Sequence, residues 1–212
     1  MTIYNFAAGP ATLPAEVLQE AQRDLVALPG VGISLLEMSH RSKPVVEMIE
    51  SAEQDIRDLA GIPDNYQVLF LQGGASLQFS MVPMNLLTPN GHADHIVTGN
   101  FANLALKDAK KVGNIRLAGS TEDSNHDCIP SQEQLDLDLA ADYVHFTGNN
   151  TIYGTEWATE PATGDVPLVG DLSSNIFSKP IDVSKYGLIY AGAQKNLGAA
   201  GATLVIIRDD LL

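Results

Sequence analysis

A lysine and an aspartate each follow a short apolar run in the second half of the chain, where they could take part in catalysis. Lys195 lies in the segment AGAQKNLGAAG, and Asp171 comes directly after the apolar run at 168–170. A lysine that is partly removed from water has a lowered pKa and can act as a nucleophile toward an aldehyde. Taken singly, Lys195 also fits an ordinary solvated lysine, and Asp171 fits a turn or helix-cap residue.

A glycine-rich turn, Gly73-Gly74-Ala75-Ser76, separates a predicted strand from a predicted helix. Free backbone N–H groups at the start of a helix, together with the positive end of its dipole, suit a phosphate. The same glycines also fit a tight turn that needs only their conformational freedom. Taken together, the amine, the carboxylate and the phosphate donors match the aldehyde, ring nitrogen and phosphate of pyridoxal phosphate. These features predict a pyridoxal phosphate site.

Hydrophobic patterning predicts the elements that must position these residues. Seven apolar runs predict strands at 68–71, 95–98, 115–118, 143–147, 168–170, 188–191 and 203–208. Helices are predicted at 14–28, with Thr12 as the N-cap, and at 42–60, 76–87 and 101–112. This alternation is typical of an α/β fold in which helices cover a mostly parallel seven-stranded sheet. Only residues 192–202 join the last two strands, so the final strand is expected to be antiparallel.

Loops that follow the predicted strands carry the polar and small residues. In an open α/β sheet, ligands bind where loops leave the carboxyl ends of the strands. We therefore expect five loops to converge on one crevice, and these are 72–76, 99–101, 148–151, 171–174 and 192–196.

Charge and composition narrow the classes of partner. Lys and Arg number 12 against 26 Asp and Glu, a formal net charge of −14 that disfavours nucleic acid and anionic lipid. Cys128 is the single cysteine, and the chain starts without a signal-peptide pattern, so we expect a cytoplasmic protein that does not enter membranes. His92 and His95 have a metal-like spacing but no third ligand nearby, so no metal site is predicted.

Long segments of the chain resemble the phosphoserine branch of the class V aminotransferases, which have the type I pyridoxal phosphate-dependent fold. The matching segments are NFAAGPATLPAEVLQEA, EMSHRSKP, FLQGGASLQFSMVPMNLL, NNTIYGTEW and VGDLSSNIFSKPIDVSKYGLIYAGAQKNLGAAGATLVIIR. The resemblance implies an N-terminal arm at 1–15 and a large cofactor-binding domain at 16–212. Family members continue into a smaller C-terminal domain, which we expect to be absent from this chain.

Residue roles follow from this resemblance. Lys195 resembles the family's Schiff-base lysine, and Asp171 resembles the partner of the protonated ring nitrogen. The other implied contacts are Ala75, Ser76 and Gln194 with the phosphate, Thr151 near the phenolic oxygen, Phe101 stacked on the ring, and His40 and Arg41 with the substrate anion. Relatives usually have tryptophan in place of Phe101 and often arginine in place of Ser76, so phosphate binding here is expected to depend more on backbone donors.

The resemblance also implies a reaction. It is the transfer of the amino group of L-glutamate to 3-phosphohydroxypyruvate by a homodimer, with a related step of pyridoxine synthesis as a second possible reaction. Two alternatives stay open. One is a non-catalytic chain that keeps the fold, and the other is a different class V enzyme, such as a cysteine desulfurase or a serine–glyoxylate aminotransferase. The strings around His40-Arg41 and NNTIYGTEW favour the phosphoserine branch.

Overall fold

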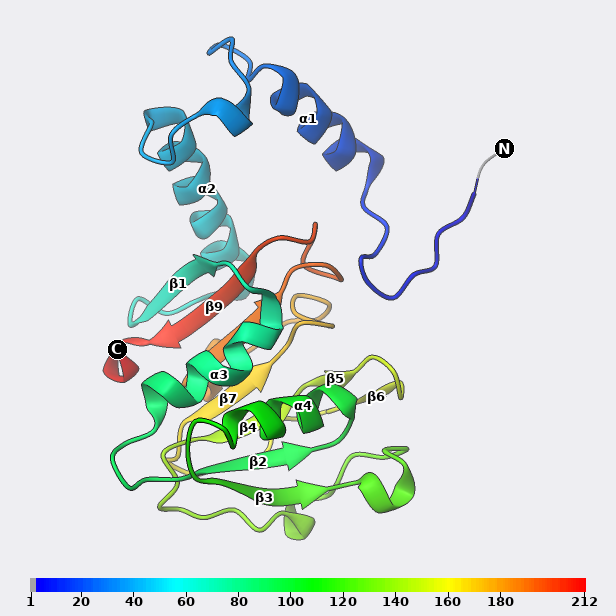
Figure 1. The fold of residues 1–212 in the computed structure, drawn as a ribbon, viewed down its shortest axis with the longest axis vertical. Coiled ribbons are helices and arrows are strands. Elements are labelled where there is room, and N and C mark those ends of the chain that lie inside the picture. Colours follow the sequence, from blue (N-terminus) through cyan, green and yellow to red (C-terminus); the bar gives the residue numbers. More distant parts are fainter. Residues whose placement is uncertain (1–2) are drawn as a thin grey trace.

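The computed structural model describes residues 3–212, and its main feature is a seven-stranded sheet (Figure 1). The strand order is β1-β9-β8-β7-β4-β2-β3. Their bounds are β1 Tyr66–Leu71, β2 Ala93–Val97, β3 Ile115–Ser120, β4 Val144–Thr147, β7 Leu168–Asp171, β8 Leu188–Gly192 and β9 Thr203–Arg208. β9 is antiparallel to both β1 and β8, whereas the other neighbouring pairs are parallel. The predicted mostly parallel sheet with an antiparallel final strand is confirmed.

Two very short strands form a hairpin that sequence patterning did not predict. β5 (Asn149–Asn150) pairs antiparallel with β6 (Thr155–Glu156), and the two form a separate sheet. Strands of two polar residues are too short to show the alternation by which strands are recognised. The hairpin matters because it carries Thr151 at its turn.

The helices lie close to their predicted positions, with one correction. Their bounds are α1 Ala15–Val26, α2 Lys43–Ala60, α3 Gly74–Leu86 and α4 Asn100–Ala109. The prediction that Thr12 caps α1 is wrong, because Pro14 holds the N-cap position and the Thr12 hydroxyl donates to the Asn5 carbonyl at 2.9 Å. α2 ends as predicted at Ala60, and its C-cap Gly61 is in the left-handed region with φ +58°.

Each face of the sheet is covered by a different set of elements. α3 and α4 lie across one face (Figure 1), where they bury residues such as Val169 and Tyr190. The opposite face is covered by the end of α2 and by irregular segments that contribute Trp157, Ile176 and Tyr186. Strand residues alternate between these two cores, as the pleat requires. Asp171 is two residues from Val169 and therefore faces the α3 side.

Most of residues 3–50 lie away from the sheet (Figure 1). α1 has no buried residue, and α1 and the first turns of α2 project beyond the sheet in Figure 1. Exposed apolar side chains on this part include Ile3, Tyr4, Phe6, Val17, Leu18, Leu25, Val26 and Ile49. In this single chain the apolar stripe of α1 therefore lacks a packing partner among the described residues. Among residues 3–212, no helix is long and apolar enough to cross a membrane.

Stability should depend on the central strands rather than on the periphery. Ile189 on β8 is fully buried, so Ile189→Ala should lower the free energy of unfolding by about 2–5 kcal/mol, measured by urea denaturation. Ile152 is 62% exposed, and Ile152→Ala should change it by no more than about 0.5 kcal/mol. Equal losses in the two variants would contradict this description of the core.

Candidate active site

Loops at the carboxyl ends of the strands converge on one pocket of about 220 Å³. Seven residues singled out from the sequence line it: Ala75, Ser76, Phe101, Thr151, Asp171, Gln194 and Lys195. They come from five separate loops or helix starts, so the predicted convergence is confirmed. The roles of the individual residues are taken up below as proposals.

Lys195 lies in the loop between β8 and β9, with its side chain half-buried. Its Nζ donates a hydrogen bond to Thr151 Oγ1 at 2.6 Å and lies 5.3 Å from the centre of the Phe101 ring. Burial lowers the pKa of the Lys195 amine, and the negative charge of Asp171 opposes this shift. An amine with a lowered pKa is a better nucleophile near neutral pH.

Asp171 ends β7 and is 4% exposed. Its Oδ1 accepts hydrogen bonds from the backbone N–H of Ser173 at 3.0 Å and from the Ser173 hydroxyl at 2.6 Å. Burial raises the pKa of the Asp171 carboxyl, while the hydrogen bonds from Ser173 and the charge of Lys195 oppose the rise. A carboxylate buried in this way needs a cationic or hydrogen-bonding partner in the pocket.

Glycines allow the start of α3 to approach the end of β8. Gly73 has φ +96°, and a Cβ on it would come within 2.4 Å of Leu77 Cδ2. A Cβ on Gly192 would come within 3.0 Å of the Ala75 amide nitrogen. The first-turn amides of a helix have no acceptor within the helix, so this end of α3 offers donors to an anion in the pocket. The glycines thus allow this close packing as well as the tight turn.

The hairpin turn and the loop after β7 are joined by a chain of hydroxyl groups. Thr151 Oγ1 donates to Ser174 Oγ at 3.3 Å, and Ser174 Oγ donates to Asn149 Oδ1 at 2.9 Å. Sequence reasoning missed Ser173, Ser174 and Asn149 as site residues. For Ser173 a signal existed, because a serine two residues after an aspartate is typical of a turn in which the carboxylate accepts from that serine.

The N-terminal arm also reaches the site, which the sequence did not reveal. The Ala11 amide donates to the Gln194 carbonyl at 2.8 Å. A Cβ on Gly9 would lie 3.1 Å from Lys195 Cγ, so the arm backbone packs directly against the lysine. Residues 1 and 2 of the predicted arm lie outside the described residues.

His40 and Arg41 are not brought to the pocket in this chain. Both are exposed in the turn before α2, where Arg41 Nε donates to His40 Nε2 at 3.4 Å. Neither residue lines the pocket that holds Lys195. Their role toward a substrate anion therefore stays a prediction.

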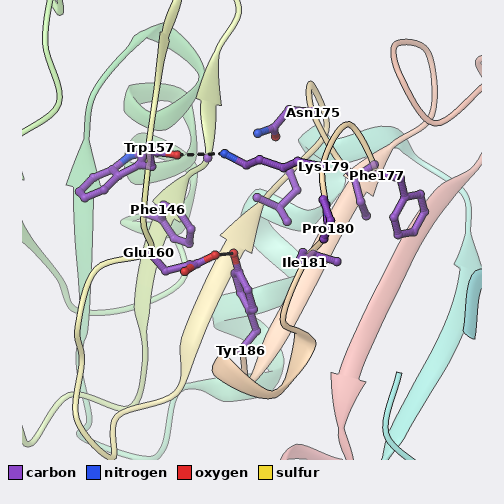
Figure 2. Close-up of a pocket in the computed structure, with 12 residues that line it drawn as sticks. Phe146, Trp157, Glu160, Asn175, Phe177, Lys179, Pro180, Ile181 and Tyr186 are labelled. Atoms are coloured by element: carbon purple, nitrogen blue, oxygen red, sulfur yellow. Dashed lines mark hydrogen bonds between the residues drawn. The ribbon is translucent and has the colours of Figure 1, made fainter. Parts of the chain in front are cut away.

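A second and smaller cavity, of about 40 Å³, is lined by residues from the opposite face of the sheet (Figure 2). Trp157 meets Phe146 edge-on with ring centres 5.6 Å apart and packs in the core on this face. Lys179 points toward the Trp157 carbonyl, and the Tyr186 hydroxyl donates to Glu160 at 3.1 Å. None of its lining residues lines the pocket that holds Lys195, so this cavity is separate from the site.

Comparisons with a protein-family model and with curated proteins agree with the resemblance to the class V aminotransferases. The model of the family described as aminotransferase class-V matches residues 3–212. Phosphoserine aminotransferase from Acinetobacter baylyi is 56% identical over 214 aligned residues, and that from Herpetosiphon aurantiacus is 52% identical over 212. Both alignments cover 100% of this chain, and the chain spans 59% of the length of each of these curated relatives.

Solved structures agree with the sequence matches. Phosphoserine aminotransferase from Bacillus circulans subsp. alkalophilus has a TM-score of 0.94 at 47% identity, covering 98% of this chain and 57% of its own. A pyridoxal phosphate-bound phosphoserine aminotransferase from Trichomonas vaginalis has a TM-score of 0.91 at 36% identity, covering 99% of this chain and 59% of its own. The similarity thus extends over nearly the whole chain.

The burial of Lys195 predicts that its amine loses its proton at a lower pH than an ordinary lysine. Because burial lowers the pKa of its amine, Lys195 should become reactive toward trace acetic anhydride at a lower pH than Lys185. Lys185 is the matched control, since its hydrogen bond and charge interaction with Glu160 raise the pKa of its amine. Competitive labelling between about pH 7 and pH 11, read by mass spectrometry, measures both. Coincident titration of the two lysines would contradict the desolvated position of Lys195.

Proposed function

The chain belongs to the class V aminotransferase family. We propose that it binds pyridoxal phosphate and forms the cofactor site of a phosphoserine aminotransferase. The proposed reaction moves the amino group of L-glutamate to 3-phosphohydroxypyruvate, giving O-phospho-L-serine and 2-oxoglutarate. The observation that carries the proposal is the meeting of a desolvated lysine, a buried carboxylate and a helix N-terminus in one pocket. The names of the curated relatives favour this reaction over those of cysteine desulfurases or serine–glyoxylate aminotransferases.

The residues present fit pyridoxal phosphate. When bound, this cofactor supplies an aldehyde that condenses with amines and a ring that stores electrons. Lys195 would hold the aldehyde carbon, Asp171 the ring nitrogen and the start of α3 the phosphate. The close approach of Gly192 to Ala75 leaves no room for a larger side chain between the lysine loop and the helix. The pocket therefore offers a partner for each reactive part of the cofactor.

Lys195 has two tasks in this proposal, holding the cofactor and moving a proton. Its Nζ would also act as the general base that carries the substrate α-proton. Thr151 accepts a hydrogen bond from this nitrogen at 2.6 Å and so orients it within the pocket. Gly9 packs against the aliphatic stem, which limits the positions that the amine can reach.

Asp171 and Phe101 would act on the ring. An ionised Asp171 keeps a bound pyridine nitrogen protonated, because the charge pair offsets the cost of burying the carboxylate. Phe101 stands at the start of α4 and would stack on the ring without the hydrogen bond of an indole. Ser76, Ala75 and Gln194 would bind the phosphate from the rim of the pocket.

We also propose that residues 16–212 form the cofactor-binding domain behind an arm at 1–15, in a cytoplasmic enzyme. His40 and Arg41 keep their proposed role in binding the substrate phosphate or carboxylate, for which an arginine fork is suited. Since the chain spans 59% of its relatives' length, the activity is proposed for the protein of which these residues form the cofactor site.

Reductive trapping tests the site. Addition of pyridoxal phosphate followed by borohydride should attach one pyridoxyl group to Lys195, located by peptide mapping. Lys195→Arg should remove the label, whereas Lys179→Arg, an exposed lysine outside this pocket, should retain it. In a separate sample that has not been reduced, L-glutamate should convert the bound cofactor to its amino form, followed by absorbance. A label on another lysine, or none at saturating cofactor, would refute the assignment.

We further propose that two copies associate through the exposed apolar surface of the arm and α1. Val17, Leu25 and Val26 are 46%, 46% and 77% exposed, and α1 contributes nothing to either core of the chain. A helix with an apolar stripe is stabilised mainly by the packing of that stripe. A second copy supplies such a partner.

Light scattering at several concentrations should therefore give twice the mass of the chain. Val17→Glu should weaken association at least about tenfold, because an unpaired carboxylate would be buried in the contact. Leu139→Glu, at a position 79% exposed and distant in sequence from the arm, should leave association unchanged. A monomer at all concentrations, or equal effects of the two variants, would argue against this interface.

A further inference from the structure

A row of polar side chains lies buried beneath α3 and α4, on a face that is otherwise apolar. His145 Nε2 and Tyr190 Oη are 2.8 Å apart, and both residues are at most 2% exposed. Tyr190 is the register partner of Asp171 on the neighbouring parallel strand, so the two side chains lie on the same face. The row therefore runs from the interior of the sheet to the carboxylate of the proposed site.

The position of the protons along this row can be derived. Burial lowers the pKa of His145 to about 3, so the ring is neutral and carries one proton. His145 Nδ1 is buried without a hydrogen-bond partner among the described residues. A buried donor without an acceptor is less well tolerated than a buried acceptor without a donor. The proton therefore belongs on Nε2, which donates to Tyr190 Oη.

The Tyr190 phenol must then direct its own proton elsewhere. Burial raises the pKa of Tyr190, and the charge of Asp171 raises it further, so the hydroxyl stays protonated. A hydroxyl that accepts from His145 can donate to the Asp171 carboxylate, and the Tyr190 hydroxyl contributes to lowering the pKa of Asp171 against the effect of burial. The hydrogen bonds of the row therefore all point the same way, from His145 through Tyr190 to Asp171.

We propose that Tyr190 and His145 are positioning residues that keep Asp171 ionised through a directed chain, His145 Nε2–H to Tyr190 Oη–H to the Asp171 carboxylate. The inference rests on the proposed function, because an ionised Asp171 is what a protonated pyridine nitrogen requires. Hydrogen bonds to the charged form of a carboxylate favour that form. Tyr190 thereby supplements the two hydrogen bonds from Ser173.

Other titratable groups around the row act on its ends. Lys195, from the loop after β8, opposes neutralisation of Asp171, and Ser173 donates from its own loop. His145 stacks on His95 of β2 with ring centres 4.5 Å apart, and the pKa of His95 is also lowered by burial. Tyr143 adds a neutral phenol on the same face. Loss of Tyr190 removes one group that lowers the pKa of Asp171, so the pKa of this carboxyl should rise.

The chain offers a matched control in a second histidine–tyrosine pair. His95 Nε2 and Tyr143 Oη lie 3.4 Å apart, and both residues are as deeply buried as the first pair. Tyr143 precedes β4, whereas the register partner of Asp171 is Tyr190. Removing either phenol deletes one oxygen from the same core, but only Tyr190 lies beside the carboxylate.

The first experiment reads the proton positions in the unmutated chain. Long-range proton–nitrogen NMR of histidine-labelled protein should show His145 neutral with its proton on Nε2 at neutral pH. Tyr190→Phe should shift the Nε2 resonance of His145, which also assigns it. A proton on Nδ1 of His145 would overturn the proposal, because Tyr190 would then donate to the histidine and not to Asp171.

The second experiment follows binding of pyridoxal phosphate by fluorescence between about pH 5 and pH 8. Tyr190→Phe should raise the dissociation constant for pyridoxal phosphate about tenfold near pH 5 and by less near pH 8. The reason is that the Asp171 carboxyl of this variant becomes protonated, and so neutral, at a higher pH than in the unmutated protein. Tyr143→Phe should leave the pH profile unchanged. His145→Gln, which retains an N–H donor, should lie closer to the unmutated protein than His145→Leu.

Failure of this inference can be told apart from failure of the proposed function. If borohydride labels Lys195 but Tyr190→Phe and Tyr143→Phe have the same pH profile, the directed chain is refuted and the cofactor site stands. If Lys195 is not labelled, the proposed function fails, while the tautomer of His145 still reports the direction of the chain.

Discussion

The burial of the Asp171 carboxylate is the constraint on which the site depends. A charged carboxylate removed from water is costly unless donors and a cation compensate it. Ser173 supplies two donors from the same turn, and Lys195 supplies the opposing charge from another loop. Each of these compensations requires a particular backbone path, so the loop after β7 and the loop after β8 cannot vary independently.

The parallel pairing of β7 and β8 places these two loops at the same edge of the sheet. β8 and β9 pair antiparallel, so the chain that leaves β8 at Gly192 turns back within the loop that carries Lys195. The absence of a side chain on Gly192 lets this loop lie against the first turn of α3. Because α3 itself starts after the end of β1, a strand distant in sequence from β8 and β9 also determines where the lysine amine meets the phosphate-binding turn.

Local signals predicted much of this arrangement. The apolar runs before Asp171 and Lys195 gave the strands correctly, and the short connection after β8 predicted its antiparallel partner. The β5–β6 hairpin could not be predicted, since two-residue polar strands carry no periodicity. The relation of Tyr190 to Asp171 depends on strand register, a long-range property that neither residue's neighbours encode. The prediction of Thr12 as a cap failed because its hydroxyl found an acceptor in the arm, the carbonyl of Asn5.

The N-terminal arm links the exposed apolar surface to the chemistry. The side chains of Tyr4 and Phe6 are 78% and 92% exposed, whereas a few residues later the arm packs on Lys195 through Gly9 and bonds Gln194 through Ala11. Ordering the apolar end of the arm against a partner would therefore also restrict the backbone beside the lysine. Loss of that partner would free the arm and with it the stem of Lys195, whose hydrogen bond to Thr151 would then have to hold the amine alone. The proposed association and cofactor binding are therefore coupled through the arm, by the close contact between Gly9 and the stem of Lys195.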